Sequence, residues 1–354
     1  MRTSRHRREV LLEGDVRVRL TQIDGVLPNL ALMKLAHWHK AKGDEVTFSR
    51  SVNRDLFDEA PDAHYASSIF KFSQDRLMRF QMTWPEATIG GTGTPFVHTV
   101  EQVLCVDEYE NYDYSAYPDF AGSIGFTQRG CRLKCKFCVV PAKEGKPKSL
   151  NTIERIWRGE PHPKHLHLLD NDFFGQPEWR ERVAEIRDGG FKVCLNQGIN
   201  VRLIHEEGAK ALATIDYRDD SFSHKRLYTA WDNLKDEGIF FKGVNTLEQA
   251  GIPPKHLMAY MLIGFDQAET WDRIWHRFTL MVEREISPYP MVFNRSRKDL
   301  LCFQRWVIAM GGLYRFISWG DYERETKSAE SVEAWKPYAD RLKAALPKLQ
   351  KEAA

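Results

Sequence analysis

Six short apolar runs, each followed by a helix-like segment, limit the fold of this chain more than any other feature. They are AGSIGF (121–126), HLHLLD (165–170), KVCLNQ (192–197), RLYTAW (226–231), LMAYMLIGF (257–265) and YPMVFN (289–294). Short apolar runs are typical of buried strands, and their alternation with helices indicates parallel crossovers. Six such units predict a partial (β/α)6 TIM-type barrel over residues 121–296, with a helical C-terminal extension over 297–354.

A smaller series of strands and helices precedes the barrel. After a basic arm (1–14), residues 15–106 predict a small parallel α/β (Rossmann-like) domain. VRVRLTQID (16–24), EVTFSR (45–50), HYASSIFKF (64–72) and FQMTW (80–84) are its candidate strands. A helix is expected after Asn29, and the acidic, aromatic stretch 107–120 predicts a linker to the barrel.

Composition sets the class of protein. The chain has 354 residues, 42% of them hydrophobic, and a formal net charge of +2. This length is enough for a core without disulfides, and the small charge gives no argument for nucleic-acid or membrane binding. With no apolar run of about 18 residues and no signal-peptide pattern, we expect no membrane association and a cytoplasmic location, where thiols stay reduced.

The cysteines are unevenly spaced. Three of the six lie within eight residues, in GCRLKCKFCVVP, as Cys131, Cys135 and Cys138. A local thiol cluster in a reducing compartment indicates a metal. Three thiolates can bind three irons of a [4Fe–4S] cube, and without a fourth cysteine one iron stays open to a ligand.

This loop resembles the signature of the radical S-adenosylmethionine (SAM) superfamily, which has an aromatic residue before the third cysteine, here Phe137. The loop also follows the first predicted barrel strand, as in that superfamily. The resemblance implies a [4Fe–4S] cluster on the three cysteines, SAM as cofactor, and an electron donor of the flavodoxin or ferredoxin type. The implied reaction cleaves SAM to a 5′-deoxyadenosyl radical, which abstracts hydrogen from a substrate.

Polar residues follow the ends of consecutive predicted strands, where barrel enzymes place their sites. By resemblance, Asp170 and Asn171 stand where the SAM amino group is bound, Asn196 or Gln197 would bind ribose, and Arg202 the SAM carboxylate. The implied cofactor set also includes Trp231, Ile263 and Gly264, the last two beside adenine, with Gln267 where the family has a glutamate. Asp172, Asp232 and Arg295 are candidates on the substrate side. Each residue alone is more typical of a turn or a helix cap than of a site, but their recurrence at consecutive strands favours a site.

Two alternative cofactors stay open. A zinc site would need a fourth ligand from His162, His165 or His167, about one βα unit away. The domain order also resembles radical SAM proteins with a cobalamin-binding domain, so a cobalamin-dependent methyltransferase is the alternative enzyme. The loop 24–29 lacks the axial histidine usual there, His37 and His39 fall in the next helix, and the turn 90–93 is glycine-rich.

The cysteine loop is basic. Its cations are Arg129, Arg132, Lys134, Lys136, Lys143, Lys146 and Lys148, with Glu144 as the only acid between 129 and 148. Such a loop would attract an anionic reductant or a nucleic acid, although a solvated surface explains it equally well. For the substrate, a nucleic-acid base or nucleotide-like molecule is weighed against a peptide or small metabolite. Cys105, Cys194 and Cys302 are isolated, as packed thiols usually are, with hydrogen donation by Cys302 as the alternative.

Overall fold

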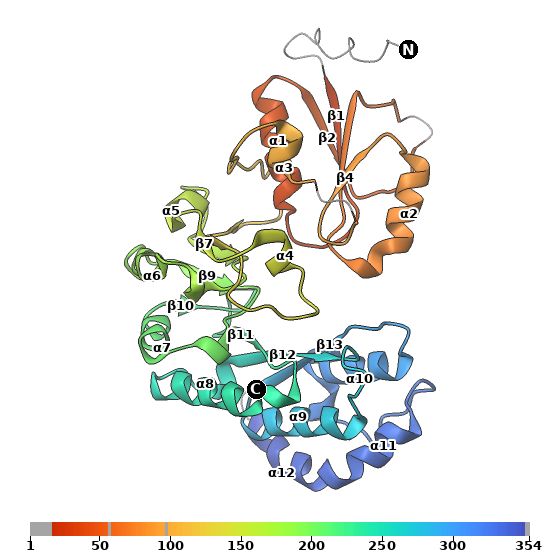
Figure 1. Ribbon diagram of the computed structural model, residues 1–354, viewed down its shortest axis with the longest axis vertical. Helices are drawn as coiled ribbons and strands as arrows, with labels where there is room; N and C mark the ends of the chain where they lie inside the picture. The colour runs from red at the N-terminus through yellow and green to blue at the C-terminus, as the bar shows by residue number, and fades with distance from the viewer. Residues whose placement is uncertain (1–15, 56–57, 96–97, 351–354) are drawn as a thin grey trace. The chain divides into compact units, whose positions relative to one another are not determined.

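The computed structural model describes residues 16–55, 58–95 and 98–350. The chain divides into two compact units, residues 1–121 and 122–354, each with its own sheets and helices (Figure 1). Parallel strands predominate in both units, so the protein belongs to the α/β class.

The first unit is a four-stranded parallel sheet with helices. Its strands are β1 (Arg17–Gln22), β2 (Glu45–Ser49), β3 (Ala63–Ser67) and β4 (Thr88–Gly90), in the order β2-β1-β3-β4. Its helices are α1 (Leu30–Ala41), α2 (Gln74–Thr83) and α3 (Val100–Leu104), with a 3₁₀ turn at Lys71–Ser73. As predicted, a helix begins after Asn29, whose Oδ1 accepts a hydrogen bond from Leu32 N at 3.2 Å.

One strand prediction in this unit is wrong. FQMTW lies at the end of α2 and beyond it, not in a strand. Leu77 and Phe80 of α2 are buried, as is Trp84 just after it, and this helical spacing turns one apolar face towards the core. The helical pattern therefore outweighs the strand preference of the aromatic residues.

The predicted linker packs on the first unit. Residues 107–120 form no helix or strand, but Tyr117 is buried. Its hydroxyl donates to Gln22 Oε1 at 2.7 Å and accepts from Asn29 N at 3.1 Å. The segment is therefore held against the end of β1.

The second unit contains two parallel sheets. β5 (Ser123–Gly125), β8 (His165–Leu168), β9 (Lys192–Leu195) and β10 (Asp216–Tyr217) form one sheet in the order β10-β9-β8-β5, and β11 (Leu227–Ala230), β12 (Leu257–Ile263) and β13 (Ser287–Val292) form the other. Ile199 N donates to Tyr228 O at 2.8 Å between the sheets. Each of the six predicted runs overlaps one strand, with β13 beginning two residues before its run, whereas the short β10 was not predicted.

Helices follow most of these strands. They are α4 (Val140–Glu144), α5 (Ile153–Ile156), α6 (Trp179–Asp188), α7 (Glu206–Ala213), α8 (Glu237–Gln249), α9 (Trp271–Glu283), α10 (Lys298–Ile308), α11 (Ala329–Trp335) and α12 (Ala339–Gln350). The 3₁₀ turns are Phe173–Gly175, Val201–Leu203, Leu234–Asp236, Pro254–His256, Ala309–Gly311, Leu313–Arg315 and Lys336–Tyr338. Apolar side chains of α6 to α10 pack with one face of the strands in a single core. The region after β13 is mostly helical, as predicted.

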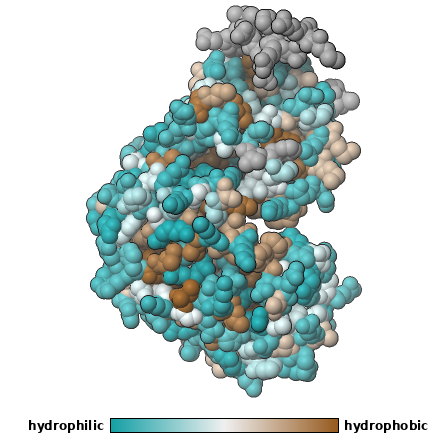
Figure 2. All heavy atoms as spheres, viewed as in Figure 1, coloured by the Kyte–Doolittle hydropathy of each residue, from teal (hydrophilic) through white to brown (hydrophobic). Residues whose placement is uncertain are grey.

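Most of the surface seen in Figure 2 is hydrophilic, with apolar patches between the polar side chains. None of the helices in the described part of the chain has the length and apolar character needed to span a membrane.

Candidate functional site

The cysteine loop begins and ends at a short pair of antiparallel strands. β6 (Gln128–Arg129) pairs with β7 (Lys148–Ser149), so the two ends of the loop are held together. Inside it, Cys131 N donates to Gly145 O at 3.2 Å and Cys138 N donates to Cys135 O at 3.0 Å. The loop is therefore a folded segment attached directly after β5.

All three thiols of the loop are half-buried. Burial raises the pKa of the Cys131 thiol, and the neighbouring Cys138 and Cys135 raise it further. The pKa of Cys138 is likewise raised, first by burial and then by Cys135. The thiols therefore lie close enough to influence one another's charge. No group of three or more His, Cys, Asp or Glu side chains in the described ranges is arranged to hold a single metal ion.

Two acidic residues anchor the loop. The Asp172 carboxylate accepts hydrogen bonds from Arg132 N at 3.1 Å, Arg132 Nε at 2.7 Å and Arg132 Nη2 at 2.9 Å. Glu144 accepts from Arg129 Nη2 at 2.8 Å, Gly130 N at 3.0 Å and Asn171 Nδ2 at 3.0 Å. Asn171 and Asp172 follow β8, so the end of β8 positions the cysteine loop.

Asp170 directly precedes Asn171 and Asp172 in the chain and is fully buried. Its carboxylate accepts from Thr127 N at 2.7 Å, Thr127 Oγ1 at 2.5 Å and Gln128 N at 2.9 Å. Burial raises the pKa of Asp170 to about 7, although these hydrogen bonds act in the opposite direction. The hydrogen bonds of this carboxylate fasten the start of β6 to the end of β8.

Arg202 and Asp232 lie near the cysteines. Arg202 Nη2 is 3.9 Å from Cys135 Sγ, and its Nη1 donates to Asp236 Oδ2 at 2.8 Å. Asp232 accepts from Leu262 N at 3.3 Å. Burial raises the pKa of Asp232, while Arg202 lowers it, and the charge of Asp232 in turn raises the pKa of Cys138. Thus residues after β9 and β11 meet the loop that follows β5.

The end of β12 also reaches this loop. The ring of Phe137, between the second and third cysteines, meets the ring of Phe265 edge-on at 5.5 Å between centroids. Ile263 is fully buried and its carbonyl accepts from Phe293 N at 3.0 Å. Gly264 has a φ of +75°, and its N–H donates to Glu269 Oε2 at 2.8 Å. The aromatic residues therefore cover the strand ends beside the cysteines.

Other predicted site residues lie in the core, beside His167 or at the surface. The Trp231 indole is fully buried and stacks on Phe240, so it is a core side chain. Asn196 Oδ1 lies 3.1 Å from His167 Nδ1. Gln197 and Arg295 are exposed. Among the histidines considered for zinc, His165 and His167 both contact the ring of Phe222.

Sequence reasoning missed Glu269 and Arg277. Arg277 is fully buried and forms an ion pair with Glu269. Glu269 in turn accepts a hydrogen bond from Gly264 N. A glutamate was sought near position 267, so Glu269 was two residues from the expected place. Glu144 was noticed only as the single acid of a basic segment. That signal, an acid alone among cations, was sufficient to mark it as an anchor.

The first unit gives little support to a cobalamin site with a histidine ligand. His37 Nδ1 is 2.6 Å from Tyr109 Oη, and His39 Nδ1 is 2.7 Å from Asp44 Oδ2. Gly91 has a φ of +106°, and an added Cβ would lie 2.1 Å from Ser68 O. The glycine-rich turn therefore allows close backbone approach between the loops after β3 and β4.

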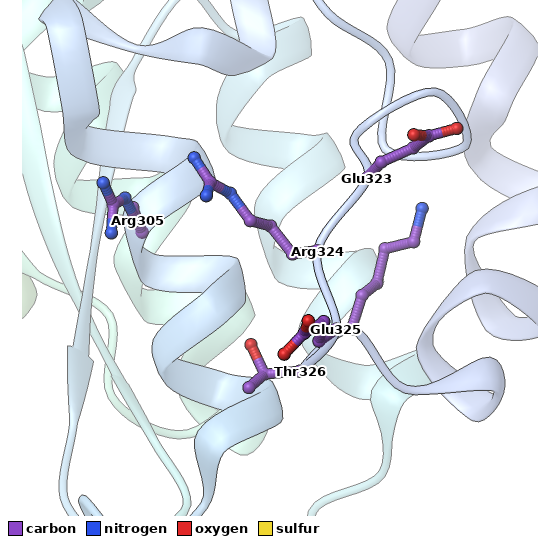
Figure 3. A pocket seen from close by; sticks show the side chains of 6 residues that line it. Arg305, Glu323, Arg324, Glu325 and Thr326 are labelled. Carbon is purple, nitrogen blue, oxygen red and sulfur yellow. The ribbon is translucent and has the colours of Figure 1, made fainter.

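A polar pocket of about 850 Å³ lies elsewhere in the second unit. It is lined by Arg305 of α10 and by Glu323, Arg324, Glu325, Thr326 and Lys327, and Arg324 extends towards Arg305 (Figure 3). Cys302 is buried in α10, and the nearby Thr326, Lys327 and Arg324 lower its pKa against the effect of burial, which raises it. The lining residues of this pocket are all charged or polar, and none of them belongs to the cysteine loop.

Comparison of the chain with protein-family models, curated proteins and solved structures finds no match in any of the three.

Proposed function

We propose that this protein is a radical SAM enzyme that holds a [4Fe–4S] cluster on Cys131, Cys135 and Cys138 and cleaves SAM reductively to a 5′-deoxyadenosyl radical. The observation that carries this proposal is the cysteine loop itself. Three half-buried thiols lie on one short segment, which is anchored where parallel strands end. Six strands of the two sheets, β5, β8, β9, β11, β12 and β13, would form a partial barrel next to this loop.

The residues fit such a cluster chemically. Three thiolates would bind different irons of the cube, so they need not converge on one point as ligands of a single ion do. When bound, a cluster with one open iron supplies the electron that cleaves SAM. Arg202, close to Cys135, would stabilise the negative charge of the thiolates.

The neighbouring residues have separate tasks. Asp172 and Glu144 hold the loop in place through Arg132, Arg129 and the Gly130 backbone. Asp232 and Arg202 offer a carboxylate and a guanidinium to the amino and carboxylate groups of SAM. Phe137 and Phe265 provide apolar cover, and a radical needs this exclusion of water because solvent would quench it.

Anaerobic reconstitution with iron and sulfide, followed by dithionite and SAM, tests the proposal. We expect the wild type to release methionine and 5′-deoxyadenosine, and Cys135→Ala to release neither. Cys105→Ala, an exposed cysteine in the first unit, is the matched control and keeps the activity. A fully loaded wild type that leaves SAM intact would contradict the proposal.

The second candidate is a cobalamin-dependent radical SAM methyltransferase. Exposed apolar residues in the loops after β1 and β3, Val26, Ile69, Phe70 and Phe72, favour a flat ligand at the end of the first sheet. The rings of Phe70 and Phe72 are stacked at 4.9 Å. Purification in the presence of hydroxocobalamin decides between the candidates, since a retained corrin absorbance supports this one and its absence leaves the first.

A further inference from the structure

The strands of the second unit have one face that the helices do not cover. Successive residues of a strand point to opposite sides of the sheet. The strand residues that belong to the core shared with the helices are Leu166, Leu168, Val193, Leu195, Leu227, Leu257, Ala259, Met261 and Ile263. The alternate positions on the opposite face include His167, Cys194, Tyr228, Tyr260 and Tyr289, together with the apolar residues Ile124, Ala230, Met258 and Leu262. Figure 1 shows α8 and α9 together on the other side of the β11-β12-β13 sheet.

These five polar and aromatic residues come from five strands. His167 pairs in register with Cys194, and Tyr260 pairs with Tyr289. The inward layers of TIM-type barrels are dominated by Val, Ile and Leu. The His, Cys and three Tyr side chains among the apolar residues of this face therefore depart from that pattern.

Tyr228 is buried, whereas Tyr260 and Tyr289 are half-buried and can offer ring surface and a hydroxyl to a ligand. Tyr228 and Tyr260 are stacked at 6.0 Å with an interplanar angle of 11°, and Tyr289 meets Tyr260 edge-on at 5.6 Å. Tyr260 Oη donates to Asn196 O at 3.4 Å, and Asn196 also contacts His167. Stacking surfaces and hydrogen-bonding groups thus lie side by side.

This tyrosine face (Tyr228, Tyr260 and Tyr289) continues to the cysteine loop. Met291 lies two residues beyond Tyr289 on the same face of β13 and is 45% exposed, and Phe293 is 51% exposed. The Phe293 ring meets Phe265 at 4.9 Å, and Phe265 meets Phe137 of the cysteine loop. An accessible apolar strip therefore connects the tyrosines with the candidate cluster site.

We propose that the tyrosine face binds the substrate, and that the substrate is a planar heterocycle with a polar edge, of the nucleobase class. This inference rests on the proposed function and names the substrate of that site. A base stacks on aromatic rings, and its donors and acceptors pair with the tyrosine hydroxyls and the Asn196 amide. A purely hydrocarbon ring would add no hydrogen bond to the Tyr260–Asn196 and Asn196–His167 contacts already present, and an aliphatic metabolite would not use the ring planes.

Nucleoside binding tests this inference. The full-length protein, with and without reconstituted cluster, is titrated with adenosine, guanosine, cytidine and uridine by saturation-transfer NMR and calorimetry. We expect at least one nucleoside to bind, and Tyr260→Leu and Tyr289→Leu to weaken it by about tenfold or more because a stacking plane is lost. Tyr260→Phe keeps the ring and should lose less affinity. Phe316→Leu, at a residue 70% exposed, is the matched control with unchanged binding.

The outcomes separate the two proposals. If the wild type loads iron and cleaves SAM but binds no nucleoside, or if the leucine variants keep their melting temperature and full affinity, the substrate assignment is wrong and the proposed function stands. If nucleosides bind through the tyrosines but SAM is never cleaved, the proposed function fails and the face remains a nucleoside site. Binding of free tryptophan in place of every nucleoside would overturn the nucleobase class. Tighter binding of a short single-stranded oligonucleotide would identify the base as part of a nucleic acid.

Discussion

Gly130 immediately precedes the first cysteine and has a φ of +86°. An added Cβ would lie 2.2 Å from Lys146 O, across the base of the loop. We predict that Gly130→Ala destabilises the second unit and lowers iron loading, because both the positive φ and the backbone clash oppose it. Melting temperature and iron per chain measure the effect.

Gly145 provides the control for this substitution. It has a φ of +75°, but no atom lies within 4 Å of an added Cβ. Gly145→Ala therefore carries only the cost of a backbone conformation that other residues rarely adopt, roughly 1–3 kcal/mol. Equal losses in the two variants would show that the close approach at Gly130 is unimportant.

Asp170 should make stability depend on pH. Its pKa is raised by burial to about 7, against 3.8 ordinarily, so the folded state holds the proton more tightly than the unfolded chain. The free energy of unfolding should therefore fall as pH rises from about 4 to 7, by at most about 1.4 kcal/mol per pH unit. Above pH 7 this contribution is constant.

Asp170→Asn should remove this dependence, since Asn can accept from the Thr127 and Gln128 N–H groups without ionising. Urea unfolding of wild type and variant at pH 4.5, 6 and 8 measures the difference in slope. Parallel stability curves would mean that Asp170 titrates normally.

At the scale of elements, Arg277 joins α9 to the ends of two strands. Its Nη1 donates to Trp231 O at 2.9 Å, after β11, and its Nη2 donates to Leu262 O at 3.0 Å in β12. Arg277→Met should lower the free energy of unfolding by about 3–5 kcal/mol, because Glu269 and three carbonyls, those of Trp231, Asp232 and Leu262, would lose a buried partner. Arg341→Met, at an ion pair on the surface of α12, should change it little. Similar effects in chemical denaturation would show that the buried pair has no special role.

Elements could be predicted where their pattern was long enough. The apolar runs of β5, β8, β9, β11, β12 and β13 were recognisable because each is bounded by polar residues. β10 has two residues and no such run. The segment 80–84 was misread because its aromatic residues suit a strand, whereas the helical stripe includes Leu77, outside that segment.

For the whole molecule, the sequence was informative where chemistry is local. The cysteine spacing marks the loop because all three thiols lie close together in the chain. Two groupings could not be predicted. The Arg132–Asp172 ion pair and the shared face of His167, Cys194, Tyr260 and Tyr289 each join residues that only the pairing of parallel strands brings together. The substrate side of a site therefore requires the fold.

The most direct test of the account is the iron and sulfide content of the full-length protein after anaerobic reconstitution, compared among wild type, Cys131→Ala, Cys135→Ala and Cys138→Ala. The account predicts about four irons and four sulfides per wild-type chain, and a large loss of both in each variant. One zinc per chain, or iron loading that survives all three substitutions, would contradict it.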